Sequence, residues 1–100
     1  MNTLSALSDP TRQRIVEMLA SGALSSGEIA SRFDLSAPAV SQHLKTLKTA
    51  RLVRVHAEKQ KRIYELNQEG VEELAAWIAG VRAFWNPKLD ALEAALRKTP

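Results

Sequence analysis

The chain has 100 residues with no cysteine, and its 14 Lys and Arg outnumber its 11 Asp and Glu. This length allows one small domain with a thin hydrophobic core, and the lack of cysteine excludes disulfides and thiolate metal sites. No stretch approaches the roughly 20 apolar residues of a membrane span, and the first residues do not resemble a secretion signal, so we expect a cytoplasmic protein.

The excess positive charge lies in the middle of the chain. Residues 36–66 contain seven Lys and Arg against two Glu, whereas residues 1–35 and 67–100 each contain one more acidic than basic residue. A local basic excess of this kind is typical of a protein that binds a polyanion such as nucleic acid.

Three helices are predicted before residue 35. The first, over residues 3–7, is short. It is followed by Asp9, a favourable N-cap, and by Pro10, which suits the first position of a second helix over about 10–20. A third helix over 27–33 follows two serines that can cap it. Each helix shows apolar residues on one face, which is typical of helices that pack on a core.

The next helix, predicted over about 37–50, has two different faces. Ser36 is a suitable N-cap and Pro38 suits the first turn, while apolar residues recur at i, i+4 and i+7 from Val40. The opposite side carries Gln42 and other short polar or basic side chains, and it has no acidic residue. Because Gln can pair with an adenine edge in the DNA major groove, which an α-helix fits, this side is suited to reading DNA.

Together with the preceding helix and a short turn, this segment matches a helix-turn-helix, whose second helix enters the major groove. The turn has Asp34 rather than Gly. An ordinary amphipathic surface helix shows the same periodicity, so the pattern alone leaves both interpretations open. His43 lies between the two faces, where we expect a phosphate or a packing contact.

After residue 51 the hydrophobic period changes from 3.6 to 2, which predicts two short strands between about 53 and 66. The residues between them, 59–62, lack the Asn-Gly or Asp-Gly of a two-residue turn, so we expect a longer loop. A basic loop at this place is typical of a wing that contacts a minor groove or phosphates. The alternative is a Lys-rich tip that discourages edge pairing between strands.

A long helix over about 68–97 is predicted next, capped by Asn67 and with Gly70 as a mild defect in its first turn. Apolar residues recur along it at heptad a and d positions, and Pro87 should break or kink it. We interpret its apolar face, with the helix over 3–7, as a dimer interface. Packing of this helix over the N-terminal helices is the alternative. The residues predicted to form the dimer interface are Leu4, Leu7, Leu74, Trp77, Ile78, Val81, Phe84, Trp85, Leu89 and Leu92.

These elements predict a mainly α fold with a small β-hairpin (α+β), arranged as a single winged helix-turn-helix domain over residues 1–100. A two-fold dimer would place two recognition helices about one DNA turn apart on a pseudo-palindrome. The expected partners are double-stranded operator DNA and a second copy of the chain, with no membrane. The residues predicted to contact DNA are Ser36, Pro38, Ser41, Gln42, His43, Lys45, Lys48, Thr49, Arg54, Lys59, Lys61 and Arg62.

Several motifs resemble the ArsR/SmtB family of bacterial transcriptional repressors. They are Leu-Ser-Asp-Pro-Thr-Arg at 7–12 and Val-Ser-Gln-His-Leu-Lys-x-Leu at 40–47, followed by Leu52, Val53 and the basic wing. The resemblance covers roughly residues 3–85. It implies a homodimeric winged helix-turn-helix protein that binds operator DNA and blocks transcription, often of its own operon.

The sensing residues of that family do not carry over. Residues 23–29, where many members have a Cys pair, contain no Cys, and no His follows His56 to match the ligands that other members place on the last helix. The chain therefore resembles a metal-independent branch, and we expect no metal or other cofactor. A repressor that senses a metal or a small ligand through an unrecognised site, for example His56 with Glu58, is the alternative.

Two further classes of function are weighed against DNA binding. The chain has no Gly-rich phosphate loop, no H-E-x-x-H, no G-x-S-x-G and no nucleophilic Cys, so we do not expect an enzyme. A protein-interaction module can use the same fold without DNA, and the basic middle segment is the feature that argues against it.

Overall fold

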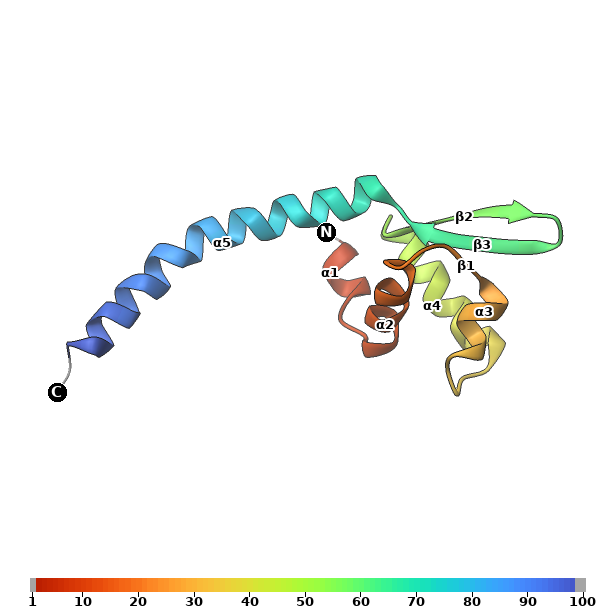
Figure 1. The fold of residues 1–100 in the computed structure, drawn as a ribbon, viewed down its shortest axis with the longest axis horizontal. Coiled ribbons are helices and arrows are strands. Elements are labelled where there is room, and N and C mark those ends of the chain that lie inside the picture. The colour runs from red at the N-terminus through yellow and green to blue at the C-terminus, as the bar shows by residue number, and fades with distance from the viewer. Residues whose placement is uncertain (1, 99–100) are drawn as a thin grey trace.

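The computed structural model describes residues 2–98, in which five α-helices and a three-stranded sheet occur (Figure 1). In chain order the elements are α1 (Asn2–Ala6), α2 (Pro10–Leu19), β1 (Leu24–Ser25), α3 (Ser26–Ser31), α4 (Ala37–Thr49), β2 (Val53–Glu58), β3 (Lys61–Leu66) and α5 (Gln68–Arg97). The prediction of a mainly α fold with a small β component is confirmed.

Helices α1 to α4 and the sheet enclose one hydrophobic core. Burial of an aliphatic side chain contributes about 1.5–3 kcal/mol, so this cluster supplies most of the stability of the body. The largest fully buried side chains come from α2, α3, α4 and the start of β2, and are Ile15, Ile29, Val40, Leu44, Leu47, Leu52 and Val53.

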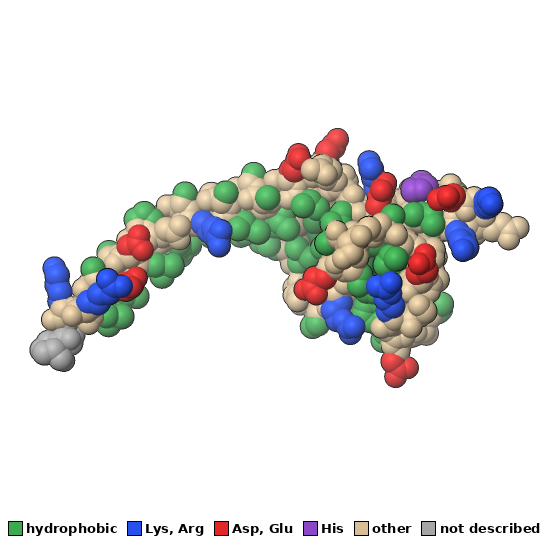
Figure 2. All heavy atoms as spheres, in the orientation of Figure 1, with side chains coloured by type: hydrophobic (Ala, Val, Ile, Leu, Met, Phe, Trp, Pro, Cys, Tyr) green, Lys and Arg blue, Asp and Glu red, His purple; other side chains and the backbone are tan. Residues whose placement is uncertain are grey.

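Helix α5 extends away from this body, so that the molecule measures 65 × 28 × 22 Å (Figure 1). Leu74 in its first half packs against the core. Within the described residues, the large apolar side chains beyond it are 44–65% exposed and do not cover the N-terminal helices. The hydrophobic side chains that run along α5 are visible in Figure 2.

Three helices begin where the capping residues predict. The Asp9 carboxylate accepts the Arg12 N–H at 3.0 Å, and the Ser36 hydroxyl accepts the Ala39 N–H at 3.2 Å. Ser25 and Glu28 form a reciprocal capping box, which starts α3 at Ser26. In the described chain, Asn67 occupies the N-cap position of α5 without a capping bond from its side chain.

The connection between β2 and β3 is shorter than predicted. Glu58 pairs with Lys61, which leaves only Lys59 and Gln60 in the turn. The prediction of a longer loop was wrong because Lys59 adopts a φ of +59°, a conformation that two-residue turns require and that usually selects Gly or Asn. Lys61 therefore belongs to strand β3 and not to the loop.

Strand β1 was not predicted. It pairs antiparallel with β3 through Leu24 with Tyr64 and Ser25 with Ile63, giving the sheet order β1-β3-β2. Two residues are too few to show an alternating pattern, so only the tertiary contact reveals this strand.

Of the predicted break or kink at Pro87, the break does not occur, because α5 continues through it to Arg97. The proline removes one backbone hydrogen bond, and the Leu, Ala and Glu residues around it favour the helix on both sides. Figure 1 shows α5 curving along its length rather than ending at this point.

Gly70 is more than the mild helix defect that the sequence indicates. It is buried, and a Cβ atom at this position would lie 1.7 Å from the carbonyl oxygen of Arg51. Only glycine allows the first turn of α5 to approach the end of α4 so closely.

The capping box makes part of the stability dependent on pH. The Ser25 backbone N–H, and then the Ser25 side chain, lower the pKa of Glu28 below its ordinary value of 4.5. A lowered pKa in the folded state gives stability that is complete above the unfolded value and is lost as the pH falls toward the folded value. We therefore expect Glu28→Gln, whose amide oxygen still accepts the Ser25 N–H, to weaken the acid dependence of the free energy of unfolding.

This prediction is checked by urea unfolding at several pH values between about 3 and 6. Glu17→Gln removes an exposed acid of α2 outside any capping box and serves as the control. If the free energy of unfolding falls by the same amount toward low pH in the wild type and in Glu28→Gln, the assignment is contradicted.

Candidate nucleic-acid interface

The polar side of α4 is held outward by the burial of its apolar side. Val40, Leu44 and Leu47 are at most 2% exposed and fix the rotation of the helix about its axis. The residues of α4 that were predicted to contact DNA, apart from His43, point away from this buried side or flank it and are exposed, and they are Pro38, Ser41, Gln42, Lys45, Lys48 and Thr49. Ser36 is exposed too, but its hydroxyl is engaged in the N-cap.

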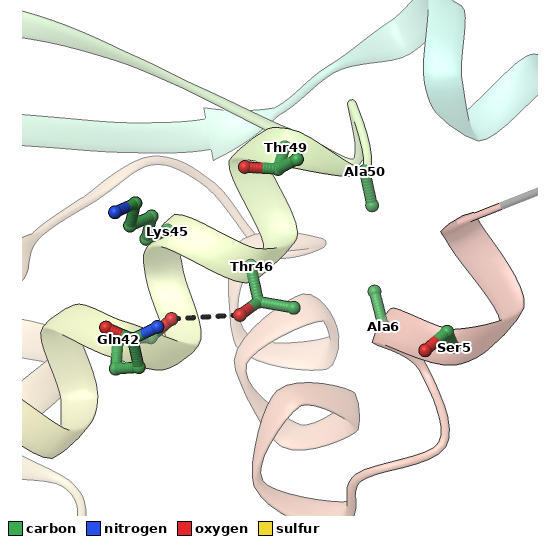
Figure 3. Close-up of a pocket in the computed structure, with 7 residues that line it drawn as sticks. All are labelled: Ser5, Ala6, Gln42, Lys45, Thr46, Thr49 and Ala50. Atoms are coloured by element: carbon green, nitrogen blue, oxygen red, sulfur yellow. Dashed lines mark hydrogen bonds between the residues drawn. The ribbon is translucent and has the colours of Figure 1, made fainter.

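A hollow of about 270 Å³ separates this side of α4 from α1 (Figure 3). Its floor is formed by Ala6 and Ala50, which face each other, and Thr46 donates its hydroxyl to the Gln42 carbonyl at 3.1 Å. Within residues 2–98, the side chains of Gln42, Lys45 and Thr49 on this wall make no hydrogen bond or ion pair. Their polar groups are free for an external partner.

A second groove, of about 260 Å³, runs between α4 and the β2–β3 hairpin. Ser41, Lys45 and Lys48 line it from the helix, and Arg62 faces them from strand β3. The structure thus brings predicted residues from two elements together around one groove. Three cations at this groove give it a positive potential that suits a phosphate backbone.

The predicted wing cations differ in their surroundings. Arg54 donates from Nε to Glu65 Oε1 at 2.7 Å across the hairpin, so its charge is compensated within the protein. Lys59, Lys61 and Arg62 are exposed and make no ion pair among the described residues. Lys and Arg side chains at the hairpin tip are visible in Figure 2.

His43 turns toward α2 rather than into either groove. Its Nδ1 lies 3.2 Å from Arg12 Nη1 and 3.9 Å from Asp9 Oδ2. Because a guanidinium only donates, Nδ1 is the acceptor, which places the proton of the neutral imidazole on Nε2.

Arg12 has a structural role that its place in the 7–12 motif does not reveal. Its Nε donates to the Ala6 carbonyl at 2.6 Å and its Nη2 to the Ser5 carbonyl at 3.4 Å, while Nη1 reaches His43. The Arg12 backbone N–H in turn lowers the pKa of the Asp9 carboxyl below its ordinary value. One side chain therefore ties α1, α2 and α4 together, and no periodic pattern could reveal this because the contacts join distant residues.

The hairpin also holds the residues of the metal-sensing alternative. His56 Nε2 lies 3.8 Å from Glu58 Oε2. In the described part of the chain, no three His, Asp or Glu side chains gather into a group able to hold a metal ion. Structural zinc sites need four protein ligands and catalytic ones three, so His56 and Glu58 alone supply fewer ligands than either kind of site requires. The described helices also include none with the length and apolar character to cross a membrane.

Comparisons with known proteins agree with this architecture. The HTH-type transcriptional regulator Rv2034 of Mycobacterium tuberculosis is 49% identical over 84 residues, which cover 84% of this chain and 76% of the relative. The transcriptional repressor SdpR of Bacillus subtilis is 36% identical over 77 residues, which cover 77% of this chain and 86% of the relative.

Similarity at the level of structure extends over nearly the whole chain. The solved structure of a possible transcriptional regulator for arsenical resistance matches with a TM-score of 0.78 at 35% identity, covering 95% of this chain and 96% of that one. Residues 9–55, which include α2, α3 and α4, match the family described as "Bacterial regulatory protein, arsR family". The predicted winged helix-turn-helix fold is confirmed, and the chain belongs to the arsR family of bacterial regulatory proteins.

Proposed function

We propose that this protein is a transcriptional repressor that binds operator DNA as a homodimer in the bacterial cytoplasm. The observation that carries the proposal is the exposed face of α4, which has free polar and basic side chains and no acid, on a helix fixed by three buried residues. The relatives named as a regulator and a repressor support it.

Base recognition is assigned to the middle of α4. The Gln42 amide can donate to and accept from an adenine edge, and Lys45 can donate to guanine O6 or N7. Ser41 and Thr49 flank these two residues and can contact base edges or phosphates. Ser36 and Pro38, at the start of α4, would lie close to the DNA major groove.

Contacts to the phosphate backbone are assigned to the hairpin and the end of α4. Lys59, Lys61 and Arg62 are unpaired in the described chain and can reach a minor groove or phosphates beside the recognition helix, and Lys48 can add a further contact. Arg54 contributes less to DNA binding than the sequence suggests, because Glu65 already compensates its charge.

The dimer interface is assigned to α5 and the exposed part of α1. A contiguous apolar face on a helix without a partner marks an interaction surface in a soluble protein. A second copy of the chain covers it with the same face, as a two-fold axis requires. The exposed members of the predicted interface are Leu4, Trp77, Ile78, Phe84, Trp85, Leu89 and Leu92.

Selection of binding sites from random duplexes tests sequence-specific recognition. We expect the wild type to enrich a short inverted repeat and Gln42→Ala to relax one position of it, at a cost of about 1–3 kcal/mol in affinity for the selected site. Gln68→Ala, on α5, is the matched control and should keep the wild-type motif. If the wild type enriches no motif, the proposal is wrong.

The hairpin cations are tested by the salt dependence of binding. Replacing Lys59 and Lys61 with Ala should weaken binding to all sequences alike and reduce the slope of log affinity against log salt by roughly 2, about 1 for each lost phosphate contact. Lys98→Ala removes a cation at the far end of α5 and should leave the slope unchanged. A loss confined to the selected motif would contradict the assignment to phosphates.

The homodimer is tested by sedimentation equilibrium. Trp85→Ala removes a large apolar side chain from the exposed face of α5 and should lower the dimer fraction, because aromatic anchors dominate such interfaces. Leu35→Ala, at an exposed apolar residue outside α5, is the control. Unchanged sedimentation of Trp85→Ala would contradict the assigned interface.

A further inference from the structure

The end of α4 and the start of α5 are locked together in what we call the elbow, formed by Arg51, Leu52, Asn67, Glu69, Gly70 and Glu73. Arg51 follows the α4 C-cap with a φ of +63°, in the left-handed region where helix ends usually place Gly or Asn. The Arg51 N–H donates to the Lys48 carbonyl at 3.0 Å, and the Leu52 N–H donates to the Leu47 carbonyl at 3.1 Å. This Schellman-type ending turns the Arg51 carbonyl toward α5.

The backbone of α5 rests directly on that carbonyl. A Cβ atom on Gly70 would lie 1.7 Å from the Arg51 oxygen and 2.7 Å from its carbonyl carbon. Beside this contact, the Asn67 N–H donates to the Leu52 carbonyl at 2.9 Å. The first turn of α5 is therefore fixed at two neighbouring backbone points.

The Arg51 side chain holds the same turn from the outside. Its Nη1 donates to Glu73 Oε1 at 3.0 Å and its Nη2 to Glu69 Oε2 at 3.3 Å. All three side chains are more than half exposed, so these ion pairs add little to the free energy of unfolding. They join the end of α4 to two successive turns on one face of α5.

We propose that Arg51 and Gly70 are positioning residues that determine specificity for half-site spacing, because the elbow sets the angle between the recognition helix α4 and the dimer helix α5. This inference rests on the proposed function. In a two-fold dimer built through α5, that angle fixes the distance and rotation between the two copies of α4. Arg51 serves this purpose and does not contact DNA, since two carboxylates already neutralise it.

The geometry shows how sensitive the spacing is to the elbow. Cβ atoms essentially never approach other atoms closer than 3.0 Å, so Gly70→Ala must displace the two backbones by at least 1.3 Å. If α5 pivots at Asn67, which lies about 4.5 Å from Gly70 along the helix axis, this displacement tilts α5 by about 15°. Over the roughly 22 Å from Gly70 to Trp85, the tilt moves the dimer face by about 6 Å, which is close to two base-pair steps.

The test is binding-site selection from a library in which two fixed half-sites are separated by variable spacers. Gly70→Ala is compared with Gly80→Ala, in the same helix, where a Cβ meets nothing within 4 Å. Arg51→Ala and the double variant Glu69→Gln, Glu73→Gln are compared with Glu72→Gln. Glu72 is a suitable control because its carboxylate accepts from the Gln68 amide and not from Arg51. Sedimentation of each variant verifies the dimer, and affinity for a single half-site verifies the recognition helix.

We expect the wild type to prefer one spacing and Gly70→Ala to shift the preference by one or two base pairs. Arg51→Ala and the double variant should reduce the discrimination between neighbouring spacings by about two- to fivefold. Single half-site affinity should remain unchanged in all variants, which a merely structural defect in α4 would not allow.

Variants that dimerise and keep the wild-type spacing with full discrimination overturn this inference while leaving the proposed function intact. If Gly70→Ala does not fold, Arg51→Ala and the double variant decide the question in the same way. A wild type that enriches no inverted repeat overturns the proposed function and this inference with it.

Discussion

The burial of the apolar side of α4 is the constraint on which the rest of the structure depends. Val40, Leu44 and Leu47 occupy successive turns and meet side chains from α2, α3 and β2 in the same core. Because interiors are packed densely, the helix cannot rotate about its axis without opening a cavity. The direction of Gln42 and Lys45 is therefore decided by residues that never reach solvent.

The size of this core supports the proposal that a second copy of the chain covers α5. A chain of 100 residues buries less than 70% of its unfolded surface, and its body is already closed without the second half of α5. The aromatic side chains of α5 consequently remain 44–60% exposed within the described chain. In the proposed dimer, a second copy would add apolar burial over these side chains and would place a second recognition helix on the same duplex, so that stability and DNA recognition would be linked through one helix.

The sequence predicts well those features of the fold that follow from local patterns of apolar and capping residues. The buried spacing from Val40, the capping residues Asp9 and Ser36 and the apolar stripe of α5 are local patterns, and they located the helices and the exposed side of α4. Contacts between distant residues leave no such pattern, so the Arg12–His43 contact and the fit of Gly70 on Arg51 appear only in the fold. Unusual backbone conformations are equally hidden, because Lys59 and Arg51 adopt positive φ values without being Gly or Asn.

The charges show most clearly how the fold changes the meaning of a sequence feature. The basic segment supplies seven cations, which the sequence offers as one polyanion-binding set. The fold divides them. Arg51 and Arg54 pair with glutamates and stiffen the elbow and the hairpin, while the other five lie exposed on α4 and the hairpin. Cations that hold the scaffold need to be neutralised, whereas cations that attract phosphate need to be left unpaired, and the placement of Glu65, Glu69 and Glu73 meets both requirements.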